Sequence, residues 1–140
     1  MEIHNTQDDI PLPSSYPDQL RALLNHLQET FHLPSLEPLT IVLVNDDRIR
    51  ELNRQFLGRD RPTNVLAFDL GDTKEIYISV QTAVREFGPD AVLEGVAFYA
   101  FHGILHLSGF DHLQAHRQKE MESVEHEAWR MIQQWFSSSP

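Results

Sequence analysis

The most apolar stretch of the sequence, from Val96 to Leu107, constrains the fold most strongly because it must be buried. A membrane-spanning helix needs about 20 apolar residues. This run has about 12 and contains two histidines and a glycine, so it predicts a buried helix over about 90–108 and no membrane segment. The first residues lack the basic start and the apolar stretch of a signal peptide. We therefore expect a cytoplasmic protein.

Apolar residues at helical spacing predict further helices. The first lies between a cap at Ser15 and a stop at Pro34, and the second lies between a cap at Asn45 and Gly58. A short helix over 81–87 ends at a Gly-Pro pair. The residues expected to face inward are Leu20, Leu23, Leu24, Leu27 and Phe31 in the first helix, Ile49, Leu52 and Phe56 in the second, and Met121, Val124, Ala128, Ile132 and Trp135 in the last.

Three short segments rich in β-branched residues predict strands. Residues 39–44 are apolar almost throughout and predict a strand buried on both faces. Residues 64–68 and 75–80 flank turn-forming residues and predict a hairpin. A chain of 140 residues without cysteine is long enough for one domain, 1–140, with a core that needs no disulfides and a frayed tail at 137–140. The expected fold class is α+β, a small mixed sheet packed against several helices.

Three histidines have the spacing of metal ligands. On a helix, His102 and His106 lie one turn apart, so both imidazoles project from the same face. Gly109 suits a left-handed turn that lets the chain reverse and bring His112 towards them. Three imidazoles without cysteine predict one Zn²⁺ with water in the fourth position, the arrangement of catalytic zinc. The other five histidines lack this spacing and are expected to be ordinary: His4, His26, His32, His116 and His126.

The same histidine spacing occurs in metzincin peptidases, where a glutamate follows the first histidine and acts as general base. Gly103 occupies that position here, and Asp111 is the only acid inside the motif. A peptidase would therefore need another base, and Asp111 is the one candidate catalytic side chain. A zinc-bound water can still hydrolyse an ester or phosphodiester without a carboxylate.

Basic residues are few but clustered. The chain has 21 Asp and Glu against 11 Lys and Arg, a formal charge of -10, which argues against indiscriminate binding to nucleic acids, and no DNA partner is expected. Between Arg48 and Arg61, however, five arginines face two acids, Glu51 and Asp60. Two interpretations stay open: a phosphate-binding edge with Arg59 and Arg61 on the substrate, or a solvated helix face with local ion pairs.

The histidine segment resembles the YbeY family of bacterial endoribonucleases, whose signature is close to H-G-x-L-H-L-x-G-[YF]-D-H. Every specified position is matched from His102 to His112. Residues 62–68 are similar to the family's P-T-[DN]-V-L-S-F, with Ala67 in place of the serine, and residues 75–79 resemble its G-[DE]-I-x-I-S strand, with Lys74 in place of the glycine. Met121 and Glu125 resemble the M-x-x-x-E of its last helix. The likeness covers about residues 37–135.

This resemblance implies a zinc-dependent endoribonuclease that cleaves single-stranded RNA in ribosomal RNA maturation, together with ribosomal components, and it implies His102, His106 and His112 as the zinc ligands. One departure concerns the family's aromatic-Arg-Gly-Lys-Asp segment, where Leu57 stands at the arginine and Arg59 at the lysine. Two alternatives stay open. One is a metallohydrolase acting on a peptide or phosphoester, and the other is a ribosome assembly factor with a largely structural zinc.

Overall fold

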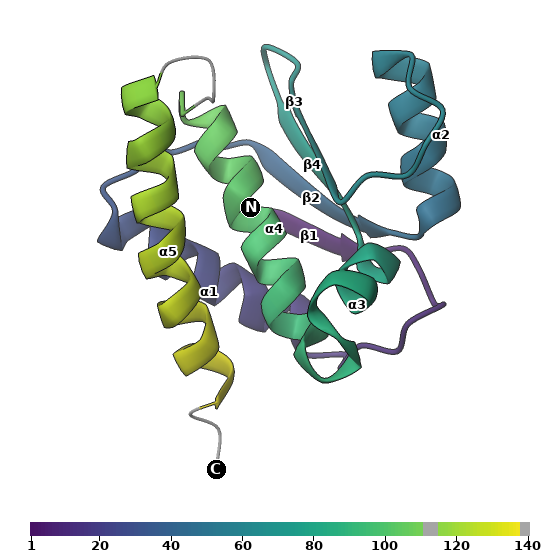
Figure 1. The fold of residues 1–140 in the computed structure, drawn as a ribbon, viewed down its shortest axis with the longest axis horizontal. Coiled ribbons are helices and arrows are strands. Elements are labelled where there is room, and N and C mark those ends of the chain that lie inside the picture. Colours follow the sequence, from purple (N-terminus) through teal and green to yellow (C-terminus); the bar gives the residue numbers. More distant parts are fainter. Residues whose placement is uncertain (111–114, 138–140) are drawn as a thin grey trace.

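The predicted α+β class is confirmed. The computed structural model describes residues 1–110 and 115–137, with side chains described up to 110 and from 118 to 137. Its described strands form one four-stranded sheet, surrounded by helices (Figure 1). The elements in chain order are β1 (Glu2–Asn5), α1 (Tyr16–Thr30), β2 (Leu39–Val44), α2 (Asp46–Leu57), β3 (Val65–Asp69), β4 (Lys74–Ser79), α3 (Val80–Phe87), a 3-10 turn (Pro89–Ala91), α4 (Val92–Leu107) and α5 (Ala115–Ser137).

The sheet is mixed and has the strand order β1-β2-β4-β3. β2 pairs in parallel with β1 and β4, whereas β3 pairs antiparallel with β4, so the predicted hairpin is confirmed. β1 was not predicted, because Ile3 is its one buried side chain and the segment carries no strand pattern of its own. Within the described part of the chain, the far side of β3 has no strand partner. β3 therefore forms an open edge of the sheet.

Helices cover the sheet on two sides. Ile41 and Ile76 belong to a large core that also contains buried residues of α1, α4 and α5. Val44 and Leu66 belong to a second, smaller cluster beneath α2. In Figure 1, α4 lies between α5 and the β3–β4 hairpin, and α2 lies beyond the hairpin. The open edge of β3 therefore lies between α2 and α4.

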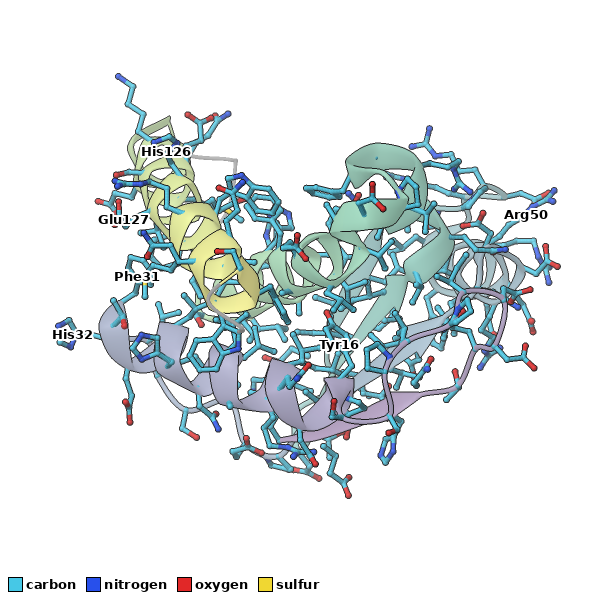
Figure 2. All side chains as sticks on the ribbon, turned by 90° about the horizontal axis from the view of Figure 1, so that it is seen from below. Tyr16, Phe31, His32, Arg50, His126 and Glu127 are labelled. Carbon is cyan, nitrogen blue, oxygen red and sulfur yellow. The ribbon has the colours of Figure 1, made fainter. Side chains whose placement is uncertain are left out.

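The predicted buried helix is α4, and most of its side chains are buried. A Cβ atom at Gly103 would lie 3.0 Å from Cδ1 of Ile76 on β4, so glycine allows α4 to approach the sheet closely. A side chain at this position, such as the glutamate of a metzincin, would require Ile76 to shift by a few tenths of an ångström. Tyr16 on α1 donates a hydrogen bond of 2.7 Å to the backbone carbonyl of Leu93 and lies in the interior (Figure 2). None of the described helices is long and apolar enough to cross a membrane.

Two details of the predicted helices are corrected. Phe56 was expected to face inward, but it lies in the last turn of α2, past the small cluster, and its side chain is 57% exposed. The inward position belongs to Asn53, which is 2% exposed. Trp135 is 37% exposed because it lies near the end of α5, where its ring stacks on His26 at 5.9 Å. The predicted N-cap position of Ser15 is confirmed, although its side chain makes no capping hydrogen bond.

The N-termini of α2 and α3 are joined through one carboxylate. Asp46 accepts hydrogen bonds from the hydroxyls of Ser79 and Thr82 at 2.7 and 3.1 Å and from Arg85 at 2.6 Å. Partial burial favours a higher pKa for Asp46, but these hydrogen bonds and the charge of Arg85 outweigh it and hold the pKa below its ordinary value. The carboxylate form therefore stabilises the folded state.

Replacing Asp46 with asparagine is expected to lower the free energy of unfolding at pH 7 by about 1–2 kcal/mol, because hydrogen bonds to a charged group are lost. Because the pKa of Asp46 is lower in the folded state, its carboxylate stabilises the fold fully above the unfolded-state pKa of about 3.9. This stabilisation is lost as the pH falls through the folded-state pKa. The difference between wild type and variant should thus shrink below about pH 4. Urea unfolding of both proteins at several pH values measures this difference. Asp47→Asn, on the exposed side of the same turn, is the control, and equal losses in both variants would contradict this role.

Candidate metal centre

His102 and His106 lie next to each other on α4, as their spacing predicts. Their Nε2 atoms are 2.9 Å apart, and their ring centroids are 4.5 Å apart with the planes at 75°. Two nitrogens bound to one tetrahedral ion at about 2.0–2.1 Å would lie about 3.3 Å apart. The two imidazoles therefore present their Nε2 atoms at nearly the separation that a shared ion requires.

Glu125 on α5 orients one of these imidazoles. Its Oε1 lies 3.1 Å from Nδ1 of His102, and the side chains of His102 and Glu125 are 26% and 15% exposed. A neutral His102 that donates its Nδ1 proton to this carboxylate keeps the lone pair of Nε2 for an ion. A carboxylate behind a histidine is the usual outer partner of a metal-bound imidazole.

The turn after α4 has the geometry that Gly109 was expected to provide. Gly109 has φ of +100°, its N–H donates to the carbonyl of His106, and the N–H of Phe110 donates to the carbonyl of Leu105. This pair of hydrogen bonds is a Schellman motif, which ends a helix and turns the chain. Asp111 and His112 lie outside the described residues, so His112 as third ligand stays a prediction. Among the residues that are described, no three His, Cys, Asp or Glu side chains group as a metal site.

The two histidines line a cavity of about 520 Å³, which we call the β3-edge cavity. It lies along the open edge of β3, between α2, α4 and the loop 58–64. Arg59 and Arg61 of that loop line it together with His102 and His106. The remaining lining residues are Asn53, Leu57, Thr63, Asn64, Val65, Leu66, Ala67, Phe68 and Gly103. The structure thus brings the predicted substrate arginines and the first two predicted metal ligands into one cavity.

The arginine cluster divides into two groups. Arg50 forms an ion pair of 2.9 Å with Asp60 and points outward at the periphery of the molecule (Figure 2), and Arg48 lies 3.4 Å from Glu51. For these two, the interpretation as a solvated face with local ion pairs holds. Arg59 and Arg61 form no ion pair with any described residue and both line the cavity. Their guanidinium groups are available to an anionic ligand.

Two features of this site were missed from the sequence. Buried Asn53 donates a hydrogen bond of 2.9 Å from Nδ2 to the backbone carbonyl of Arg61 and so holds the loop against α2. The contact of Glu125 with His102 was also missed, because 23 residues separate them. A polar residue at an inward helix position was the available signal for Asn53.

Of the histidines considered ordinary, His4, His26, His32 and His126 are exposed and none lines the cavity, while the side chain of His116 lies outside the described residues.

Comparison with known proteins gives consistent matches. The sequence model of the family described as "Endoribonuclease YbeY" matches residues 2–133. A protein named endoribonuclease YbeY from Moorella thermoacetica is 34% identical over 139 residues, covering 86% of this chain and 89% of the relative. A protein of the same name from Geobacter sulfurreducens is 35% identical and covers 68% of this chain and 73% of the relative. The solution structure of a Thermotoga maritima protein aligns with a TM-score of 0.69 at 28% identity, covering 99% of this chain and 93% of that one.

Proposed function

The chain belongs to the YbeY family of endoribonucleases, and from this premise we propose that it is a zinc-dependent enzyme that cleaves single-stranded RNA during ribosomal RNA maturation in the cytoplasm. The observation that carries this proposal is the β3-edge cavity, which two arginines without an ion pair line together with two histidines. This arrangement suits a phosphodiester, whose negative charge the arginines attract and whose hydrolysis a metal ion assists.

His102, His106 and His112 would hold one Zn²⁺. When bound, the ion supplies a Lewis acid for the phosphoryl oxygen and lowers the pKa of a coordinated water. Glu125 would keep His102 in the required tautomer and ring orientation through the contact at Nδ1. The donor set supports zinc because imidazole is one of its preferred ligands, and since the chain has no cysteine the ligands must be histidine or carboxylate side chains.

Arg59 and Arg61 would bind and orient the phosphates of the strand. Each guanidinium can donate two parallel hydrogen bonds to one phosphate, and neither has a competing carboxylate among the described residues. Leu57, at the position of the family's arginine, is 51% exposed and lines the same cavity. This placement supports Arg59 or Arg61 as the replacement for that missing charge. Asn53 would keep the backbone of Arg61 in place.

The shape and charge of the protein support a single strand within a ribosomal particle as substrate. A cavity of about 520 Å³ has room for part of one strand but not for both strands of a base-paired helix, which supports an unpaired strand as the ligand. The net charge of -10 opposes tight binding of free RNA. RNA presented by ribosomal components needs less affinity from the enzyme itself, because the particle supplies the local concentration.

The test is cleavage of a single-stranded RNA oligomer by zinc-loaded protein, compared with the same oligomer in a duplex and with casein. We expect cleavage of the single strand alone. Arg59→Ala and Arg61→Ala should raise the KM for RNA and each lower the slope of log binding constant against log salt by about 0.7, the contribution of one phosphate contact. Arg130→Ala, at an exposed position on α5 and outside the cavity lining, is the matched control.

Cleavage of casein without cleavage of RNA would favour a peptidase instead. The assembly-factor alternative predicts that a triple variant of His102, His106 and His112 still supports ribosome maturation in cells.

A further inference from the structure

A second groove adjoins the β3-edge cavity and has an exposed aromatic ring at its rim. Phe56 is 57% exposed, and its ring centroid lies 5.2 Å from that of Phe68. The groove has a volume of about 260 Å³, and Phe56, Phe68 and Tyr77 are among its lining residues. Phe68 also lines the β3-edge cavity. An RNA strand that extends out of the cavity past Phe68 would therefore meet Phe56 next.

The charge around Phe56 suits a nucleic acid strand. Phe56 lies on α2, where exposed Arg54 forms no ion pair with any described residue, whereas Arg48 and Arg50 are paired with Glu51 and Asp60. The segment from Arg48 to Arg61 as a whole has a formal charge of +3. Arg48 and Glu75 both line the groove, so the excess positive charge lies beside the groove and not within it. Exposed aromatic rings beside arginines are how proteins bind single strands without reading their sequence, since every base has a face that can stack. A protein partner would require about 800 Å² of matching surface, whereas a base requires one free ring face.

We propose that Phe56 stacks on an unpaired base of the RNA strand whose phosphate lies between Arg59, Arg61 and the two histidines. This inference rests on the proposed function, because it extends the path of the same strand. The stacked base lies outside the reacting centre, so Phe56 contributes to binding and register and takes no part in the chemical step.

The experiment measures cleavage of a uridine 12-mer and of a series of 12-mers that each lack one base. Phe56→Leu keeps an apolar side chain but removes the ring, and it should raise KM at least about five-fold, the lower end of the effect of one stacked base. Its kcat should stay within about two-fold, since binding that is equal in ground and transition states affects KM alone. Phe56→Trp should restore the wild-type KM.

The series of 12-mers that each lack one base shows which base contacts Phe56. In wild-type protein, removing one particular base should raise KM about as much as Phe56→Leu does, and in the Phe56→Leu protein the same removal should have little further effect. Trp135→Leu is the matched control, because this partly exposed ring lies near the C-terminal end of α5, at the opposite end of the molecule from the C-terminal end of α2 (Figure 1).

Two results would overturn the inference while leaving the proposed function intact. One is RNA cleavage by Phe56→Leu with an unchanged KM, and the other is equal weakening by Phe56→Leu and Phe56→Trp, which would indicate a packing role. Absence of RNA cleavage by the wild-type protein would instead refute the proposed function, and the inference with it.

Discussion

Replacing His106 with alanine is expected to remove most of the bound zinc and to lower RNA cleavage more than 100-fold. His106 and His102 present their Nε2 atoms to each other at 2.9 Å, so losing one imidazole leaves too few ligands for a tetrahedral ion. Loss of an outer-shell partner alone costs 10- to 100-fold in metal affinity or activity, and a direct ligand should cost more. Zinc content after dialysis and initial cleavage rates are the measurements.

His112→Ala should behave in the same way if His112 is the third ligand. His4→Ala, at an exposed position on β1, should bind zinc and cleave RNA like the wild type. Circular dichroism checks that the variants remain folded, since His106 is only half-buried and its replacement leaves the core intact. Stoichiometric zinc in His106→Ala or His112→Ala would refute the predicted metal centre.

The second large effect is expected at Glu125. Glu125→Gln keeps the size and a hydrogen-bond acceptor but removes the negative charge next to Nδ1 of His102. We expect zinc affinity to fall about 10- to 100-fold, because the carboxylate fixes the histidine tautomer and makes its Nε2 a stronger ligand. Competition with a chromophoric chelator measures the affinity directly, without relying on cleavage.

Glu122→Gln is the matched control for this variant. Glu122 lies three residues earlier on α5, is exposed and accepts a hydrogen bond from Gln118. It carries the same charge and lines a cavity with His102, but it forms no hydrogen bond or ion pair with either histidine. Equal zinc affinities for Glu125→Gln, Glu122→Gln and the wild type would show that Glu125 plays no part in metal binding.

Local patterns predicted the elements well, and contacts between distant elements explain the failures. The apolar run that became α4 and the Asn45 cap of α2, which accepts a hydrogen bond from the N–H of Arg48, depend on neighbouring residues alone. Phe56 fits the apolar period of α2 equally well. Its exposure depends on where the helix leaves the sheet, and no pattern within the helix contains that information. β1 forms only because β2 offers a pairing edge.

The sequence by itself determined the chemistry that is available. The spacing of His102 and His106 places them on one helix face, and Gly109 ends that helix, because helical geometry and backbone sterics act over a few residues. The tertiary structure alone decided which groups surround them. Packing α4 and α2 against the sheet brings Arg59 and Arg61 into the cavity with the histidines, and packing α5 on α4 brings Glu125 to His102. These contacts join segments far apart in the chain, so they arise only when burial of the whole apolar core sets how the helices and the sheet lie together.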